Sequence, residues 1–167
     1  MKSSINKTLA YLFATATVAG IRNRLHAAKA VRTKMPALVR LLTALESSES
    51  AHIRRFSMYL RGKTLDSDTF LAAYRKSKEE TLPPLYADLA AQYDAAGEGG
   101  KAKNLSQFMR VLAAQADLIA RYQAESEAMT TDVYVCQICG FVTTQQPTAN
   151  CPVCNAVPIK FARFDLG

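Results

Sequence analysis

Cys136-Gln137-Ile138-Cys139 and Cys151-Pro152-Val153-Cys154 contain all four cysteines of this 167-residue chain, with eleven residues between the two segments. Each Cys-x2-Cys pair places two thiolates on one tight turn, and two such turns that face each other form a tetrahedral metal site. A disulfide framework would instead spread its cysteines across the fold. The spacing therefore predicts a metal site at Cys136, Cys139, Cys151 and Cys154, and it indicates a reducing, cytoplasmic environment.

The residues that follow each pair suit a tight turn around a metal. Gly140 follows the first pair and Asn155 the second, and these two residue types tolerate a positive φ best. Short β-prone runs, Val133-Tyr134-Val135 and Phe141-Val142-Thr143, flank the first pair. Ligand spacing leaves the metal open, because four sulfurs suit both iron and zinc.

The chain before residue 130 is predicted to be helical, because Ala and Leu are abundant there and Gly and Pro are scarce. Four segments are expected: about Ser4 to Lys34, Pro36 to Leu60, 66 to 97 with a kink or break at Pro83-Pro84, and from Asn104 or Ser106 to about Met129. Long helices with short loops predict an antiparallel four-helix bundle. The predicted domains are residues 1–130, a helical bundle, and 131–167, a small metal ribbon.

The charge is uneven along the chain. Residues 1–131 carry 19 basic and 12 acidic groups, a net charge of +7, whereas residues 132–167 are neutral. This asymmetry favours docking of the two parts or an acidic partner. The basic N-terminus faintly resembles a targeting segment, but its amphipathic pattern continues past any cleavage point and favours a first helix. No stretch approaches the ~20 apolar residues of a membrane span.

The tail resembles the rubredoxin-type domain of rubrerythrins. The resemblance rests on Tyr134 to Phe141, the second cysteine pair, and the ending at Lys160-Phe161 and Phe164. It implies one iron in the four-cysteine site, cycling between ferrous and ferric states, on a ferritin-like bundle. It also implies a homodimer.

The second predicted helix contains Glu49-Ser50-Ala51-His52, the Glu-x-x-His spacing of a ferritin-like di-iron site. Both residues continue an apolar stripe that includes Leu42, Leu45 and Phe56, so they are expected on a buried face. They could also simply pair with each other. Arg22-Asn23-Arg24 resembles a motif of rubrerythrin first helices, which favours shared ancestry.

The other ligands implied by the resemblance are mostly missing. In the fourth helix Gln115 stands where Glu is expected and Leu118 where His is expected, and the first helix offers no carboxylate. Glu80 is the one further candidate, so Glu49, His52 and Glu80 are interpreted as vestigial metal ligands. Because two hard cations need several bridging carboxylates, no intact di-iron centre is expected.

Three functions remain in competition. The first is an electron-transfer protein that uses an iron centre with four cysteine ligands and a redox partner protein. The second is a rubrerythrin-like peroxidase, an oxidoreductase with an atypical site formed by Glu49, His52, Glu80 and His26, although His26 fits a surface position better. The third is a zinc-ribbon adaptor for nucleic acid or an acidic protein. Nucleic acid is disfavoured, because the basic residues spread around the first helix without interleaved aromatic side chains.

Overall fold

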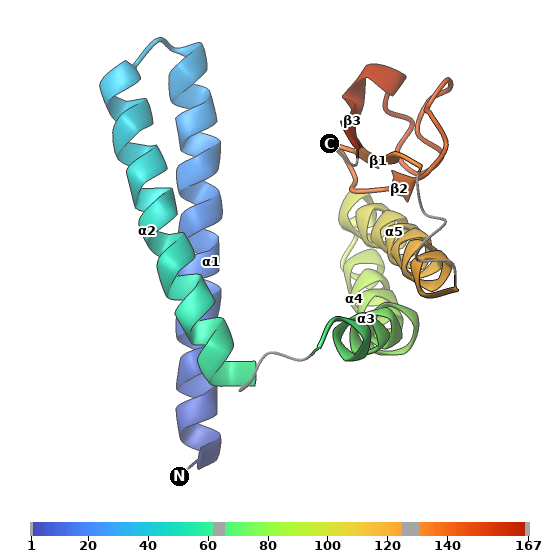
Figure 1. Ribbon diagram of the computed structural model, residues 1–167, viewed down its shortest axis with the longest axis horizontal. Coiled ribbons are helices and arrows are strands. Elements are labelled where there is room, and N and C mark those ends of the chain that lie inside the picture. The colour runs from blue at the N-terminus through green and yellow to red at the C-terminus, as the bar shows by residue number, and fades with distance from the viewer. Residues whose placement is uncertain (1, 62–65, 125–130, 166–167) are drawn as a thin grey trace. The chain divides into compact units, whose positions relative to one another are not determined.

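The computed structural model describes residues 2–61, 66–124 and 131–165. The chain forms two compact units, Met1–Leu65 and Asp66–Gly167 (Figure 1). The predicted fold class is confirmed: the chain is mainly helical and ends in a small sheet that carries the four cysteines. The expected change from helix to strand falls near residue 130, and as a domain boundary it stays a prediction. No helix in the described ranges combines the length and the hydropathy that a bilayer crossing requires.

The first unit is a helical hairpin of α1 (Lys2–Arg32) and α2 (Pro36–Arg61). Small residues line the seam between the helices: Ala16, Ala27 and Ala30 are buried, and a Cβ at Gly20 would lie 3.5 Å from the Cβ of Glu49. Arg24 reaches across the hairpin, where its Nε donates to Oε1 of Glu46 over 2.7 Å. The two helices therefore approach closely through Ala and Gly, while many larger apolar side chains of the hairpin stay exposed.

The second unit begins with α3 (Ser67–Lys76), a π-helical segment (Ser77–Thr81) and α4 (Leu82–Ala95). Asp66 caps α3, because its side chain accepts the Thr69 N–H over 2.9 Å. The prolines interrupt the long third helix as predicted, but through a π turn rather than a sharp break. Pro83 and Pro84 have no N–H to offer the carbonyls four residues earlier, and the wider turn adjusts the hydrogen-bond register there.

The last helix, α5 (Gly99–Ala124), begins five residues before Asn104, the earlier of the two predicted starts. Both predicted starts are wrong, because Gly99 and Gly100 belong to the helix. A glycine costs a helix only ~1 kcal/mol, and neither of these two has a positive φ. The Glu98 carbonyl accepts the N–H groups of Lys101 and Ala102, which closes the first turn. The predicted end near Met129 lies outside the described residues.

Three short strands form the ribbon: β1 (Val133–Cys136), β2 (Val142–Thr143) and β3 (Phe161–Phe164). Their order is β2-β1-β3, and both pairings are antiparallel, with Val135 opposite Val142 on one side and Ala162 on the other. A 3-10 turn, Pro158–Lys160, leads into β3. The two predicted β-prone runs are confirmed as β1 and β2, and β1 carries Cys136 at its end.

Candidate metal centre

Two turns of the same design carry the cysteines. In the first, the Gly140 N–H donates to the Cys136 carbonyl over 2.8 Å, and Gly140 has a φ of 80°. In the second, the Asn155 N–H donates to the Cys151 carbonyl over 2.9 Å, and Asn155 has a φ of 61°. The expected left-handed residues are therefore confirmed at both turns. This conformation lets the chain reverse its direction directly after the second cysteine of each pair.

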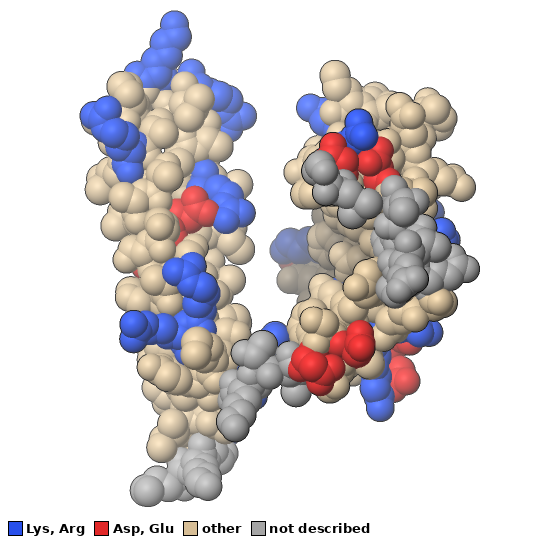
Figure 2. Space-filling view, in the orientation of Figure 1, with Lys and Arg blue, Asp and Glu red and all other residues tan. Residues whose placement is uncertain are grey.

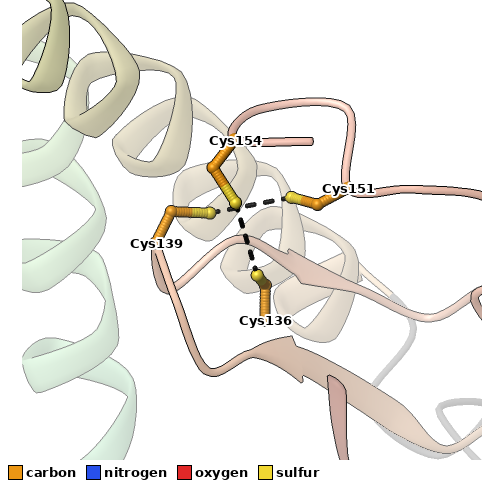
Figure 3. Close-up of side chains that lie close together, drawn as sticks. All are labelled: Cys136, Cys139, Cys151 and Cys154. Atoms are coloured by element: carbon orange, nitrogen blue, oxygen red, sulfur yellow. Dashed lines mark hydrogen bonds between the residues drawn. The ribbon is translucent and has the colours of Figure 1, made fainter. Parts of the chain in front are cut away.

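The four sulfur atoms converge on one point (Figure 3). All four lie within 4.8 Å of one another, and the Sγ atoms are 3.7 Å apart both in the Cys136–Cys154 pair and in the Cys139–Cys151 pair. A metal–sulfur bond of ~2.3 Å gives a tetrahedron with edges of about 3.8 Å. A disulfide needs an S–S separation of about 2.05 Å, so the cysteines are free thiols in metal-binding geometry.

The surroundings of the sulfurs set their protonation. Burial by itself would raise the pKa of Cys136, but N–H groups of Cys139 and Ile138 point to its sulfur and bring the pKa below its usual value. Burial raises the pKa of Cys139 well above its usual value and also raises that of Cys154, against opposing backbone N–H groups of Phe141 and Ala156. A bound cation removes this penalty, because it stabilises thiolates that burial otherwise disfavours.

Helix α5 supports the cluster from within the same unit. Val111 packs with Cys136, Cys151 and Val153 in one buried group. A Cβ at Gly140 would lie 3.8 Å from the Cγ1 of Val111, so the first turn rests against this valine. Cys136 and Cys151 are buried, whereas Cys139 and Cys154 are half-buried. The site therefore has a side closed by α5 and a side that solvent can approach.

The candidate bundle ligands fall on both units. Glu49 and His52 lie on α2, where His52 Nδ1 is 3.5 Å from Oε2 of Glu49. Glu49 is half-buried next to Gly20, but His52 is exposed, so the expected buried face is wrong for His52. Glu80 lies in the π-helical segment of the second unit, with its carboxylate 3.8 Å from Lys76. His26 is exposed on α1, as its surface interpretation requires. The role of Glu49, His52 and Glu80 as vestigial ligands stays a prediction.

Gln115 and Leu118 on α5 occupy the two positions where the resemblance implies the metal ligands Glu and His. Gln115 is half-buried, and its Oε1 atom is buried without a hydrogen-bond partner among the described residues. Leu118, one turn later, contributes to a cavity of about 140 Å³ between α5 and the β2 region. Burying a neutral amide at this depth costs far less free energy than burying a carboxylate would.

Sequence reasoning missed the residues of α5 that hold the ribbon. Nη2 of Arg110 donates to the Pro152 carbonyl over 2.6 Å, across 42 residues of sequence, and Val111 forms the apolar contact described above. A valine and an arginine on a helix carry no pattern that would single them out. Only the packing of the ribbon on α5 shows their role.

Helices followed by a ribbon with four converging cysteines define a rubrerythrin-like architecture. Solved structures of nigerythrin share this fold. The chain superposes on nigerythrin in a mixed-valence state, in a partially reduced state and in a fully reduced, all-ferrous state with a TM-score of 0.54 in each case. The identities are 16%, 17% and 15%, and each comparison covers 95% of this chain and 86% of the other. No protein-family model and no curated protein sequence matches the chain.

Proposed function

We propose that this protein transfers single electrons through one iron held by Cys136, Cys139, Cys151 and Cys154. The observation that carries the proposal is the convergence of four sulfur atoms within 4.8 Å, with 3.7 Å edges that fit one tetrahedral ion. The likeness to nigerythrin, one structure of which is described as all ferrous, favours iron over zinc. When bound, iron in such a site supplies a ferric/ferrous couple.

The chain's own residues suit a rapid one-electron change. Gly140 and Asn155 hold the two turns in a defined left-handed conformation, which favours sulfur positions that change little when one electron is added. Backbone N–H groups of Ile138 and Cys139 point to the Cys136 sulfur, and such donors stabilise a more negative cluster. Cys139 and Cys154 are half-buried, which leaves a short path for an electron from a redox partner protein.

The helical part is proposed to have lost its di-iron centre. The helices α1 and α2 together contain two carboxylates, Glu46 and Glu49, and Glu46 is occupied by Arg24. On α5 the described carboxylate is Asp117, which is exposed and paired with Arg121. A pair of hard cations needs several bridging carboxylates. Glu49, His52 and Glu80 are too few to supply them, so peroxide reduction at such a centre is not part of the proposed function.

A homodimer is part of the proposal. A ferritin-like bundle within one chain needs one long crossover connection. Only five residues separate Arg61, the end of α2, from Ser67, the start of α3, and five residues reach about 20 Å. The 26 residues of α2 extend over about 39 Å. A link this short favours a bundle that helices of two copies complete.

Metal analysis with an optical spectrum of the protein purified from its native host tests the proposed function. We expect about one iron per chain, a red colour in the oxidised form, and reversible bleaching when dithionite is added. The Cys139→Ser variant should lose this spectrum, whereas His52→Ala should keep it. Native protein that is colourless and contains only zinc would refute the electron-transfer role.

The same preparation tests the loss of the di-iron centre. Iron beyond one atom per chain, with the spectrum of a coupled iron pair, would contradict the proposal. Turnover of hydrogen peroxide that depends on His52 would also contradict it and would favour the peroxidase hypothesis. The spectrum of the four-cysteine centre provides an internal reference, because it counts the iron that belongs to the ribbon.

A further inference from the structure

Arg110 connects helix α5 to the second cysteine turn. Its Nη2 atom donates to the carbonyl of Pro152, which lies between Cys151 and Cys154, and the distance is 2.6 Å. A hydrogen bond from a guanidinium is charge-assisted and stronger than a bond between neutral groups. The bond thus joins a fixed cation to the backbone of the turn that supplies two of the four sulfurs.

The next residue of the helix supplies the apolar half of the same contact. Val111 is 5% exposed and packs with Cys136, Cys151 and Val153. It also lies beneath Gly140 of the first turn. Two adjacent positions of α5 therefore contact both cysteine turns, Val111 by packing and Arg110 by a directed bond to the second turn.

In addition to its hydrogen bond, Arg110 brings a positive charge to the turn that contains Cys151 and Cys154. Four thiolates around a ferric ion carry a net charge of −1, and one added electron changes this to −2. A nearby cation stabilises the more negative state more, so it favours reduction. Every described ion pair involves other residues, and the polar contact described for Arg110 is the uncharged Pro152 carbonyl. Its charge is therefore not neutralised by a carboxylate in the described part of the unit.

We propose that Arg110 is a positioning residue of the four-cysteine centre, which holds the Cys151–Cys154 turn on α5 and raises the reduction potential of the metal bound there. The proposed effect on the reduction potential rests on the proposed function. The positioning half does not, because it concerns the ribbon with any metal that fills the four sulfurs.

Two variants distinguish the hydrogen-bond donor and the charge of Arg110 from its aliphatic stem. Arg110→Met keeps the aliphatic stem but removes the donor and the charge, whereas Arg110→Lys keeps a donor and the charge. The matched control is Arg75→Met, which removes one half-buried cation from α3 in the same unit. Arg75 pairs with Glu79 and does not contact the ribbon through any described polar interaction.

Hydrogen exchange of the zinc-loaded full-length protein measures positioning. In Arg110→Met we expect the amides of the Cys151–Asn155 turn to exchange roughly fivefold to tenfold faster than in the wild type. Arg110→Lys should recover most of the protection, and Arg75→Met should match the wild type. Unchanged exchange in Arg110→Met, or equal acceleration in Arg75→Met, would overturn the positioning role.

The midpoint potential of the iron-loaded protein measures the charge effect. Arg110→Met should lower the potential, and Arg110→Lys should remain near the wild type. The difference should shrink as salt is added, because Arg110 is exposed. A potential that does not move in Arg110→Met, or moves equally in Arg75→Met, would refute this half. A wild type without a reversible couple would refute the proposed function, while the exchange of the zinc form would still decide the positioning role.

Discussion

Gly140 and Asn155 occupy equivalent places, each directly after the second cysteine of a pair. Both have a positive φ, 80° and 61°. Asn155 also accepts a hydrogen bond from Asn150 over 3.3 Å, so its side chain contributes to the turn. Glycine has no Cβ that opposes this conformation, and asparagine opposes it less than other residues do. The two turns thus reach the same backbone geometry with different residues.

Gly140→Ala should destabilise the ribbon by about 1 kcal/mol, because an L side chain is strained at this φ. The added Cβ would meet Val111 at 3.8 Å, an ordinary contact, so the cost comes from the backbone and not from a clash. Denaturant unfolding of the zinc-loaded protein, with metal affinity by chelator competition, checks the prediction. Asn155→Gly is the control and should change stability by only a few tenths of a kcal/mol. An alanine variant as stable as the wild type would contradict it.

At the scale of the element, two helices end in the same hydrogen-bonded motif. At the end of α4 the Glu98 N–H donates to the Tyr93 carbonyl and the Gly97 N–H to Asp94. At the end of α1 the Met35 N–H donates to Ala30 and the Lys34 N–H to Val31. Both are Schellman caps, with Gly97 at a φ of 76° and Lys34 at a φ of 56°. Lysine is an unfavourable residue for this position.

Lys34→Gly should therefore stabilise the protein by about 1 kcal/mol, and Gly97→Ala should destabilise it by a similar amount. The opposite signs follow from one cause, the strain of a side chain at a positive φ. Nothing lies within 4 Å of a Cβ at Gly97, so crowding does not contribute. Denaturant midpoints of both variants check the pair, and Lys34→Ala is the control that removes the charge but keeps the strain. If Lys34→Ala stabilised as much as Lys34→Gly, charge and not backbone strain would be responsible.

At the scale of the whole molecule, the two compact units have net charges of opposite sign. Residues 1–65 contain 12 basic and 2 acidic residues, a net charge of +10, and residues 66–167 contain 9 and 12, a net charge of −3. Figure 2 shows basic side chains along the length of the α1–α2 hairpin with little acidic surface among them. The hairpin also exposes large apolar residues, among them Leu25, Leu41 and Leu45. We expect the proposed homodimer to cover part of this exposed apolar surface.

Light scattering after gel filtration should give twice the chain mass of 18.3 kDa. Insertion of about 12 Gly and Ser residues between Arg61 and Asp66 should shift the mass toward one chain at micromolar concentration, because a flexible link gives the helices of one chain a millimolar effective concentration. The same residues added after Gly167 are the control and should leave the dimer intact. A monomeric wild type would contradict the homodimer, and an insertion without effect would show that the link does not cause it.

The sequence by itself determined the local features. The Cys-x2-Cys spacing predicted the converging sulfurs, Gly140 and Asn155 predicted the turn conformations, and Pro36 and Asp66 marked the starts of helices. These features depend on backbone preferences within a few residues, which a sequence states directly. The predicted start of α5 was wrong for a related reason. Gly99 and Gly100 have only a weak local preference against helix, which the rest of the helix overrides.

Only the tertiary structure showed what holds the metal site in place. Arg110 and Val111 are more than twenty residues from the nearest cysteine in the sequence, and the hydrogen bond of Arg110 joins residues 42 positions apart. Packing between distant segments depends on how all side chains fill the space between them, and no local pattern encodes it. The sulfur ligands were therefore readable from their spacing, whereas the helix that supports them became visible only when the ribbon was seen packed against it.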